Sequence, residues 1–478
     1  MLFDMNVASR TVVKALLVLC FAVLPICAVA YNGEMIDFEM QNSEIYPGTK
    51  RKITIYVPKE YDGKTPACLL VRLDGGGKVI ATHIDSLITE GAMPVTIGVI
   101  VRPGVIYDDN KQVVRYNRSN EFDRMDSRFA SFLEKELLPA VCNQKTSDGR
   151  EVKLSSRATD RAICGSSSGG ICAFNVAWQR PDLFSRVYVS CGTFVSFRGG
   201  DQYPALIRKC EPRPIRVFLQ DNDKDTWNPL FGSWFEYNEL MLSALQFAGY
   251  EVRHSWDKGG HSSKNAYKIY GKVLRWLWEG WPELPKKGKS QSKTLASMLI
   301  EGEEWRCVAE NIPVGAMLHP HSEDRVLLQS GRQKHFINSD GTISKAKGKV
   351  ALSNPYEATY PGGAHISKRV EGSNWVWNYI NTSDGKRSYG QQFYHLYADA
   401  GQILYDASGY LYVASKVGIQ VCDQNGRVRT ILSLPGGEVT TIAFAGNSLF
   451  AVSGGKLYVR RLLRSGTHRG VPKSERAG

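Results

Sequence analysis

The chain has 478 residues, of which 43% are hydrophobic and 22% charged, and its formal net charge is +13 at pH 7. This composition excludes a disordered or fibrous protein, and the length predicts two or three domains rather than one core. The positive charge would suit nucleic acid or acidic glycans. However, the Lys and Arg residues are scattered, apart from 286–289 and about the last fifteen residues. We therefore expect no nucleic-acid partner.

The first 30 residues have the pattern of a signal peptide. Arg10 and Lys14 precede an apolar stretch over 15–24, and small residues at 28–30 offer a cleavage site. An uncleaved anchor is the alternative, but the apolar stretch is short for a spanning helix of about 20 residues. We predict a mature protein that starts after residue 30, is secreted or periplasmic, and has no stable membrane insertion after cleavage.

Short apolar runs alternate with helical patterns from 34 to 281. Strands are expected at 52–57, 68–73, 95–101, 161–164, 186–190, 215–220 and 251–256, and helices at 128–141, from 169, at 234–247 and at 263–278. This alternation predicts an α/β domain over 31–281, with a mostly parallel sheet covered by helices. The Pro-, Lys- and Ser-rich stretch 282–297 is the expected linker.

The character of the chain changes after this linker. Short β-type runs are separated by Gly, Asp and Asn, and they lie at 325–328, 411–414, 418–422, 440–444, 449–452 and 456–459. Evenly spaced hairpins of this kind favour propeller blades. We predict an all-β, partial propeller-like domain over 298–463, followed by a basic tail over 464–478.

The cysteines give no sign of a metal site. Eight of the ten follow the signal peptide, they lie far apart, and no C-x-x-C motif occurs. Export would permit disulfides. Several cysteines sit inside apolar runs, so buried free thiols are slightly favoured over bridges.

The strongest catalytic signal is the G-x-S-x-G motif of 165–169, with Ser167 at its centre. The motif follows an expected strand and precedes an expected helix, which is the setting of a nucleophile elbow. A Ser/Gly-rich loop without catalytic function is the alternative. The N–H of Ser168, at the helix start, is the natural first donor to an oxyanion.

A serine nucleophile needs a base and an orienting acid, in the chain order Ser, acid, His. His261 lies in a glycine-containing loop after the last expected strand, whereas His254 lies within that strand. Asp221, Asp223 and Asp225 follow the preceding strand. We favour Asp225, deeper in the loop, and leave the other two open.

A glycine-rich loop over 73–77 follows an earlier buried strand. Its glycines allow the backbone to approach a substrate closely and to point an N–H inward. Gly76 is the expected second oxyanion donor, and Gly75 is expected to contact the substrate. A phosphate-binding loop is the rival, but no G-K-[ST] or G-x-G-x-x-G pattern accompanies the glycines.

Residues 44–281 resemble the esterase D and enterochelin esterase group of α/β-hydrolases, which includes feruloyl and acetyl-xylan esterases. The resemblance is carried by the stretches 73–77, 116–123, 165–170, 216–221 and 259–261. It implies a catalytic triad of Ser167, Asp225 and His261.

The resemblance also implies that a loop contacts the acyl or alcohol part of the substrate. This loop runs from Asn117 through Arg118 to Glu121. A structural turn held by an ion pair is an equally good interpretation of the same residues.

The second half resembles part of a gluconolactonase-type propeller, chiefly over 406–463. Six blades of about 40 residues need roughly 240 residues, and only 181 remain after position 297. The paired Asn and Asp-Gly signals of the metal site are also missing. A noncatalytic set of blades is therefore expected.

These features together predict a serine carboxylic ester hydrolase without cofactor or metal. The resemblance and the export signal favour esters of plant cell-wall carbohydrates, feruloyl or acetyl, as small or polymeric substrates. A siderophore esterase, a sugar lactonase that uses the second half, and a catalytically silent glycan-binding protein are the alternatives. The oligomeric state is open.

Overall fold

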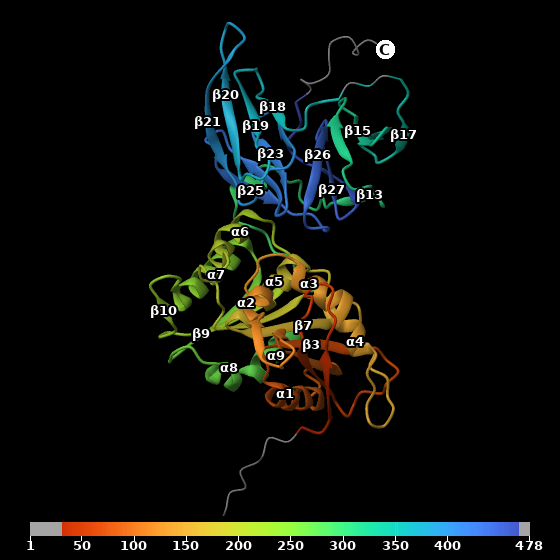
Figure 1. Cartoon of the computed structure of the whole chain (residues 1–478), viewed down its shortest axis with the longest axis vertical. Helices are drawn as coiled ribbons and strands as arrows, with labels where there is room; N and C mark the ends of the chain where they lie inside the picture. Colours follow the sequence, from red (N-terminus) through yellow and green to blue (C-terminus); the bar gives the residue numbers. More distant parts are fainter. Residues whose placement is uncertain (1–30, 349, 351, 468–478) are drawn as a thin grey trace, which may run out of the picture.

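The computed structural model describes residues 31–348, 350 and 352–467. The predicted signal peptide and most of the predicted basic tail lie outside the described residues. Figure 1 shows two parts stacked along the long axis of the molecule, a lower part of helices and strands and an upper part made almost entirely of strands.

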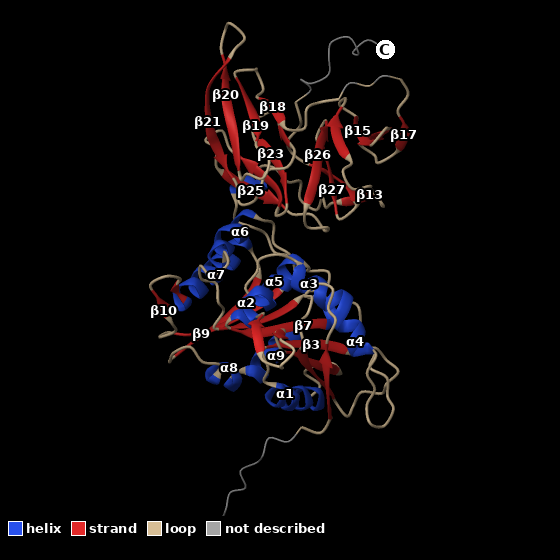
Figure 2. Ribbon diagram, viewed as in Figure 1, coloured by secondary structure: helices blue, strands red, loops and turns tan. Residues whose placement is uncertain are grey.

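The amino-terminal part is built on an eight-stranded sheet (Figure 2). In spatial order its strands are β1 (Glu34–Met40), β2 (Arg51–Val57), β4 (Thr96–Val101), β3 (Cys68–Leu73), β7 (Arg161–Ser166), β8 (Arg186–Ser190), β9 (Arg216–Asn222) and β12 (Glu251–Asp257). The first two strands run antiparallel to their neighbours, and the pairs from β4 to β12 are parallel. The prediction of a mostly parallel sheet is confirmed.

Helices cover both faces of this sheet. They are α1 (Gly77–Thr89), α2 (Arg118–Phe122), α3 (Arg128–Phe132), α4 (Leu138–Cys142), α5 (Ser168–Gln179), α6 (Tyr203–Lys209), α7 (Trp234–Ala248), α8 (Lys264–Lys268) and α9 (Tyr270–Trp278). Side chains alternate along β3, so Leu69 belongs to the same buried cluster as Phe174 of α5, whereas Leu70 belongs to a second cluster with Ile84 of α1 and Leu274 of α9. None of the helices in the described ranges has the length and apolar character needed to cross a membrane.

Short elements complete this part. They include the hairpins β5 (Val105–Tyr107) with β6 (Val113–Tyr116) and β10 (Trp227–Asn228) with β11 (Gly232–Ser233), and single 3-10 turns over Ala158–Asp160 and Gly200–Gln202. A π-helical turn over Leu133–Leu137 joins α3 to α4, so the helix expected over 128–141 is present as one continuous helical segment.

The carboxyl-terminal part consists of four antiparallel sheets of four strands each. The sheets are β14 (Met317–Pro320), β15 (Arg325–Ser330), β16 (Gln333–Asn338), β17 (Ile343–Lys345); β18 (Glu357–Thr359), β19 (His365–Arg369), β20 (Trp375–Asn381), β21 (Arg387–His395); β22 (Ile403–Tyr405), β23 (Leu411–Ser415), β24 (Gly418–Cys422), β25 (Val428–Leu432); and β26 (Val439–Ala445), β27 (Ser448–Ser453), β28 (Lys456–Arg461), β13 (Arg306–Ala309). In the last sheet, β13 from the start of this part pairs with β28 from its end. The expectation of an all-β region is confirmed.

The two parts meet at the carboxyl end of α6. Cys210 forms a parallel β-bridge with Ile431, and the buried Arg460 forms an ion pair with Glu211 at 2.5 Å. Ile431 belongs to the same hydrophobic core as the α/β part. Between the parts, the expected linker ends in the short helix α10 (Lys293–Ala296).

The cysteines of the described residues are all free thiols. Six of the eight are buried and two, Cys142 and Cys307, are exposed. The slight preference for free thiols over disulfides holds for this part of the chain.

Candidate active site

Ser167 occupies a sharp turn between a strand and a helix. β7 ends at Ser166, α5 begins at Ser168, and Ser167 itself has a φ of 56°, a conformation that costs a residue with a side chain about 1–3 kcal/mol. The neighbouring glycines are required by space, because a Cβ on Gly165 would lie 2.0 Å from the carbonyl oxygen of Gly169. The turn therefore holds the Ser167 hydroxyl at the carboxyl edge of the sheet.

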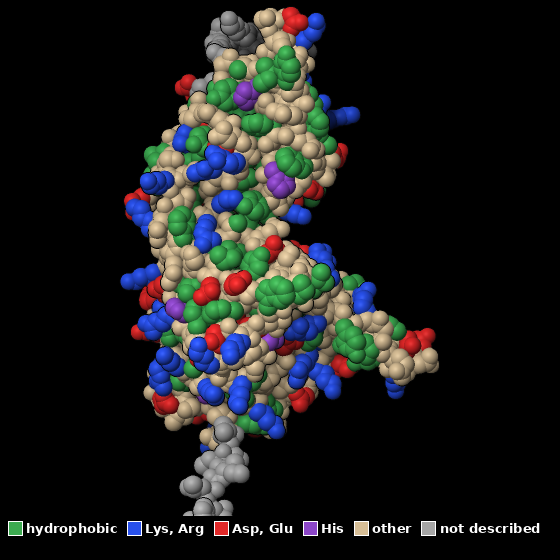
Figure 3. All heavy atoms as spheres, turned by 90° about the vertical axis from the view of Figure 1, so that its left-hand side faces the viewer, with side chains coloured by type: hydrophobic (Ala, Val, Ile, Leu, Met, Phe, Trp, Pro, Cys, Tyr) green, Lys and Arg blue, Asp and Glu red, His purple; other side chains and the backbone are tan. Residues whose placement is uncertain are grey.

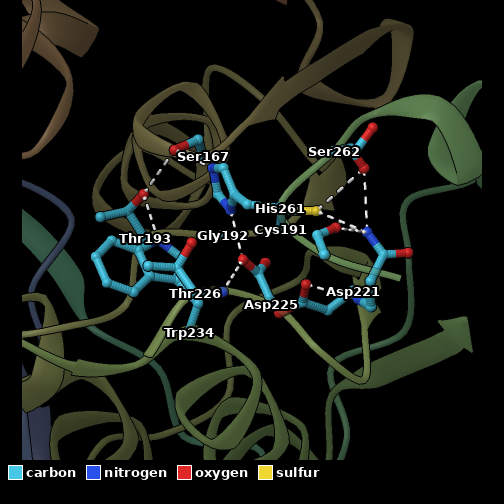
Figure 4. A network of polar contacts seen from close by, with 12 residues as sticks. Ser167, Cys191, Gly192, Thr193, Asp221, Asp225, Thr226, Trp234, His261 and Ser262 are labelled. Atoms are coloured by element: carbon cyan, nitrogen blue, oxygen red, sulfur yellow. Dashed lines mark hydrogen bonds and ion pairs between the residues drawn. The ribbon is translucent and has the colours of Figure 1, made fainter. Parts of the chain in front are cut away.

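His261 and Asp225 lie in line with this hydroxyl (Figure 4). The Nε2 atom of His261 is 3.0 Å from Ser167 Oγ, and its Nδ1 atom is 2.7 Å from Asp225 Oδ1. The Asp225 side chain is fully buried, whereas that of His261 is 35% exposed. The three residues follow β7, β9 and β12, three parallel strands of one sheet, so the fold brings their carboxyl ends together.

Asp225 is held in its ionised form. Burial opposes the charge, but hydrogen bonds from His261 and from the N–H of Thr226 keep the pKa of Asp225 below its ordinary value. An ionised carboxylate accepts a hydrogen bond from Nδ1–H, so the ring keeps its proton on Nδ1 and presents an unprotonated Nε2 to Ser167. This arrangement can take a proton from the serine hydroxyl.

Asp221 lies beside Asp225 in a different electrostatic state. Burial, followed by the hydrogen bond and charge of Asp225, raises the pKa of Asp221 to about 9. Its Oδ1 accepts from Asn222 N–H and its Oδ2 from Asn238 Nδ2, at 2.7 and 2.8 Å. Asp225 Oδ2 is buried and has no hydrogen-bond partner in the described part of the chain. Because burial and the neighbouring Asp225 raise the pKa of the Asp221 carboxyl, we expect the Asp221 O–H to be the group that can donate to this oxygen.

The Asp221→Asn variant is expected to keep ester hydrolysis within a few-fold, because its amide can donate in place of the carboxyl O–H. Asp221→Ala removes the donor, and an unpaired buried oxygen costs about 1–3 kcal/mol, so we expect a loss of roughly 10- to 100-fold in kcat. Steady-state kinetics on both variants measure this. Equal losses in both would contradict the donor role.

The pH dependence of stability provides an independent readout. Folded Asp221 keeps its proton up to about pH 9, whereas an unfolded Asp loses it near pH 4. The stabilising contribution is therefore complete below pH 4 and is lost progressively as the pH rises toward 9. Urea unfolding at several pH values should show this decline in the wild type and a smaller one in Asp221→Asn.

Two backbone segments meet where an oxyanion would form. The N–H of Ser168 lies at the start of α5. A Cβ on Gly169 would lie 3.2 Å from Leu73 Cβ, so the glycine-rich loop packs against this helix start. The N–H of Asp74 is already donated to Val101. Gly75 and Gly76 are therefore the donors that this loop can still offer.

Arg72 fixes that loop from within the sheet, and the sequence reasoning missed it. Its Nε donates to the carbonyl of Gly75 and its NH2 group to Ser166 Oγ, both at 3.0 Å. Arg72 is 3% exposed. A charged residue inside the apolar run of β3 was the available signal.

Thr193 is a second residue that sequence reasoning missed. Its Oγ1 lies 3.1 Å from Ser167 Oγ and accepts from Trp234 Nε1 at 3.2 Å, as Figure 4 shows. The Trp234 ring in turn contacts the His261 ring edge-on, with centroids 6.1 Å apart. Thr193 and Trp234 thus restrict the positions of the serine hydroxyl and the imidazole.

The loop over 117–121 divides into a structural and an exposed part. Glu121 is buried and forms an ion pair with the buried Arg51 at 2.7 Å, and Asn117 Nδ2 donates to the same carboxylate. Asn117 and Glu121 therefore do not line the site, and that expectation is corrected in favour of the ion-pair turn. Arg118, 40% exposed, donates to Asp74 and to Ser168 Oγ and does lie at the site.

The part of the chain that holds this site is similar to known proteins. Residues 44–275 match a protein family described as "Putative esterase". The chain is a carboxylic ester hydrolase. Its amino-terminal part is an esterase-type α/β-hydrolase region, in agreement with the resemblance found in the sequence.

Solved structures similar to the esterase share low sequence identity with it. A ferulic acid esterase has 17% identity and a TM-score of 0.41, covering 52% of this chain and 98% of its own. The enterobactin esterase of Shigella flexneri has 19% identity and a TM-score of 0.38, covering 51% and 59%. A feruloyl esterase module from Clostridium thermocellum has 13% identity and a TM-score of 0.38, covering 54% and 91%. The match with this chain thus covers about three fifths of the length of the enterobactin esterase. No curated protein matches it.

The competing side chains lie away from the Ser167 hydroxyl. His254 is exposed on β12 and packs against Trp256. Asp223 forms an exposed ion pair with Lys258 at 2.6 Å. Within the described ranges of the esterase, neither residue forms a hydrogen bond with Ser167 or His261.

One group at the site has metal-binding residue types. Ligand atoms of Cys191, Asp225 and His261 lie within 4.8 Å of one another. Burial, and then the charge of nearby carboxylates, raises the pKa of the Cys191 thiol, which makes it a poor ligand at neutral pH. His261 and Asp225 are also hydrogen-bonded to each other, so their ligand atoms are already engaged and the three residues are poorly suited to bind a metal.

Proposed function

We propose that the esterase acts through a triad of Ser167, His261 and Asp225. The observation that carries this proposal is the continuous pair of hydrogen bonds, 3.0 Å from Ser167 Oγ to Nε2 and 2.7 Å from Nδ1 to Asp225. The strained turn at Ser167 supports it, because such strain is typical of functional sites.

The reaction proceeds in two steps, acylation of Ser167 and hydrolysis of the acyl-enzyme. His261 Nε2 takes the hydroxyl proton as Ser167 Oγ attacks the ester carbonyl, and the resulting oxyanion accepts hydrogen bonds from the N–H groups of Gly76 and Ser168. The protonated imidazole gives its proton to the leaving alcohol, which leaves an acyl-enzyme. Water then attacks with His261 as base, and the acid and free Ser167 are released.

We propose esters of plant cell-wall carbohydrates, feruloyl or acetyl, as the substrates. Loops after β4, β8 and β9 place exposed aromatic rings in this region: Tyr116 is 77% exposed, Phe197 39% and Trp227 69%. Phe197 packs on Trp234, which touches His261. Figure 3 shows hydrophobic side chains among charged ones on one face of this part. Exposed rings suit the flat faces of a feruloyl group or a sugar.

The carboxyl-terminal part is proposed to be a closed, noncatalytic four-bladed propeller over 298–463, joined by the linker 282–297 to the hydrolase domain over 31–281. The pairing of β13 with β28 would close the ring. A cavity of about 430 Å³ has lining residues from all four sheets, among them Pro320, Thr359, Tyr405 and Phe444. Secretion or export to the periplasm is proposed from the apolar amino terminus.

The test is a substrate panel of methyl ferulate, acetylated xylan and enterobactin assayed with the purified mature chain. Hydrolysis of methyl ferulate or acetylated xylan, at a kcat/KM at least tenfold above that for enterobactin, is the expected result. A preference for enterobactin would replace the proposed substrate and leave the triad in place. The absence of hydrolysis of any ester would overturn the proposed function.

A further inference from the structure

A large open cavity lies between the two parts of the molecule, away from the Ser167 hydroxyl. Its volume is about 1030 Å³, at the upper end of the range for small-molecule sites. It is bounded by the carboxyl end of α6, by the segment that enters α10, by the end of β21 and by the start of β25. The size suits several linked rings better than a single small molecule.

The lining of this cavity is strongly basic. Five cationic side chains line it: Arg208, Lys209, Lys293, Arg427 and Arg429. No carboxylate is among the lining residues in the described part of the chain. Figure 3 shows Lys and Arg side chains on both sides of the junction.

Neighbouring acids neutralise little of this charge. Asp423 pairs with Arg427 and Arg429, yet those side chains remain 61% and 45% exposed. Lys209 contacts the Tyr397 hydroxyl at 2.5 Å and lies over its ring. The cations come from three distant stretches of sequence, so the cavity concentrates charge that is scattered along the chain.

The uncharged lining is suited to carbohydrate. The amides of Gln202, Gln291 and Asn374 can donate to and accept from hydroxyl groups. The rings of Phe247 and Tyr397 offer flat apolar surfaces. Arg side chains bind carboxylates with two parallel hydrogen bonds. A uronic-acid sugar combines a carboxylate, hydroxyl groups and an apolar C–H face that can pack on an aromatic ring.

We propose that this cavity binds a uronate-bearing stretch of the polysaccharide whose ester groups are hydrolysed at Ser167. The choice of an acidic glycan as the ligand rests on the proposed function. The basic character of the cavity is observed in the structure and is independent of that proposal. Binding here would hold a polymer on the enzyme between successive cleavages.

The experiment uses the full mature chain and hexagalacturonate as probe, with affinity measured by calorimetry at 50 and 200 mM salt. We expect binding that weakens with salt, and a loss of at least tenfold in affinity in the double variant Lys293→Glu and Arg429→Glu. Both positions are exposed or half-exposed, so the fold should persist. Hydrolysis of a small aryl ester should be unchanged in this variant, which separates the cavity from the proposed active site.

The control carries the same change in net charge elsewhere. Lys59→Glu and Lys64→Glu lie in the exposed turn between β2 and β3, and this variant should bind hexagalacturonate like the wild type. Equal weakening in both double variants, or no binding by the wild type, would overturn the proposal. Tighter binding of a single-stranded oligonucleotide than of hexagalacturonate at 200 mM salt would also overturn it.

Discussion

Ser167→Ala should lower kcat for ester hydrolysis by roughly 10³- to 10⁶-fold, since the nucleophile of a triad acts as a unit with its base. Some turnover above the uncatalysed rate should remain, because the oxyanion donors are backbone groups. The hydrogen bond from Thr193 N–H to Ser167 uses the backbone carbonyl, so the variant keeps it. Kinetics on methyl ferulate, together with labelling by a fluorophosphonate, measure the effect.

The matched control for this variant is Ser166→Ala, one residue earlier. Ser166 accepts a hydrogen bond from Arg72 at 3.0 Å, whereas the side-chain hydrogen bonds of His261 among the described residues go to Ser167 and Asp225. We expect less than a tenfold loss and full labelling in the control. Retained hydrolysis or labelling in Ser167→Ala would rule out Ser167 as the nucleophile.

Asp225→Asn is expected to lower kcat by roughly 10⁴-fold while leaving the fold intact. The amide can donate a hydrogen bond to Nδ1, which favours the tautomer that carries its proton on Nε2. That imidazole cannot accept the proton of Ser167, 3.0 Å away. Steady-state kinetics from pH 6 to 10, with circular dichroism to verify folding, measure the loss.

Asp223→Asn serves as the control because it makes the same chemical change two residues away. Asp223 is paired with the exposed Lys258, and exposed pairs contribute little to stability. Activity should remain within about twofold of wild type. A large loss in Asp223→Asn and a small one in Asp225→Asn would assign the acid to Asp223.

Much of the α/β part could be predicted because its strands are apolar runs bounded by polar residues. The strands expected at 68–73 and 186–190 have those bounds in the structure. Helix α1 was not expected, because it begins at Gly77, within the glycine-rich loop, although its buried residues Ile80, Ile84 and Leu87 recur at helical spacing. The sheet of β18 to β21 was also missed, since β21 is largely exposed and polar.

The site divides in the same way between local and nonlocal signals. Ser167 and His261 stand in short motifs whose chain order carries information. The contacts of Arg72 with Ser166 and of Thr193 with Ser167 depend instead on which strands are neighbours in the sheet. That adjacency is a tertiary property, so no local pattern could reveal these two contacts. An ion pair in the 117–121 loop was one of two interpretations, but the partner of Glu121 was not identified, because Arg51 lies 70 residues earlier.

The pairing of β13 with β28 has a consequence for synthesis of the chain. The strand that completes the last sheet is made about 150 residues before its partner β28. Until the ribosome has released β28, β13 has no partner strand and β27 has an unpaired edge, and such edges invite association with other chains. Nascent molecules that stop short of residue 456 should therefore be prone to aggregation even when their hydrolase half is already folded.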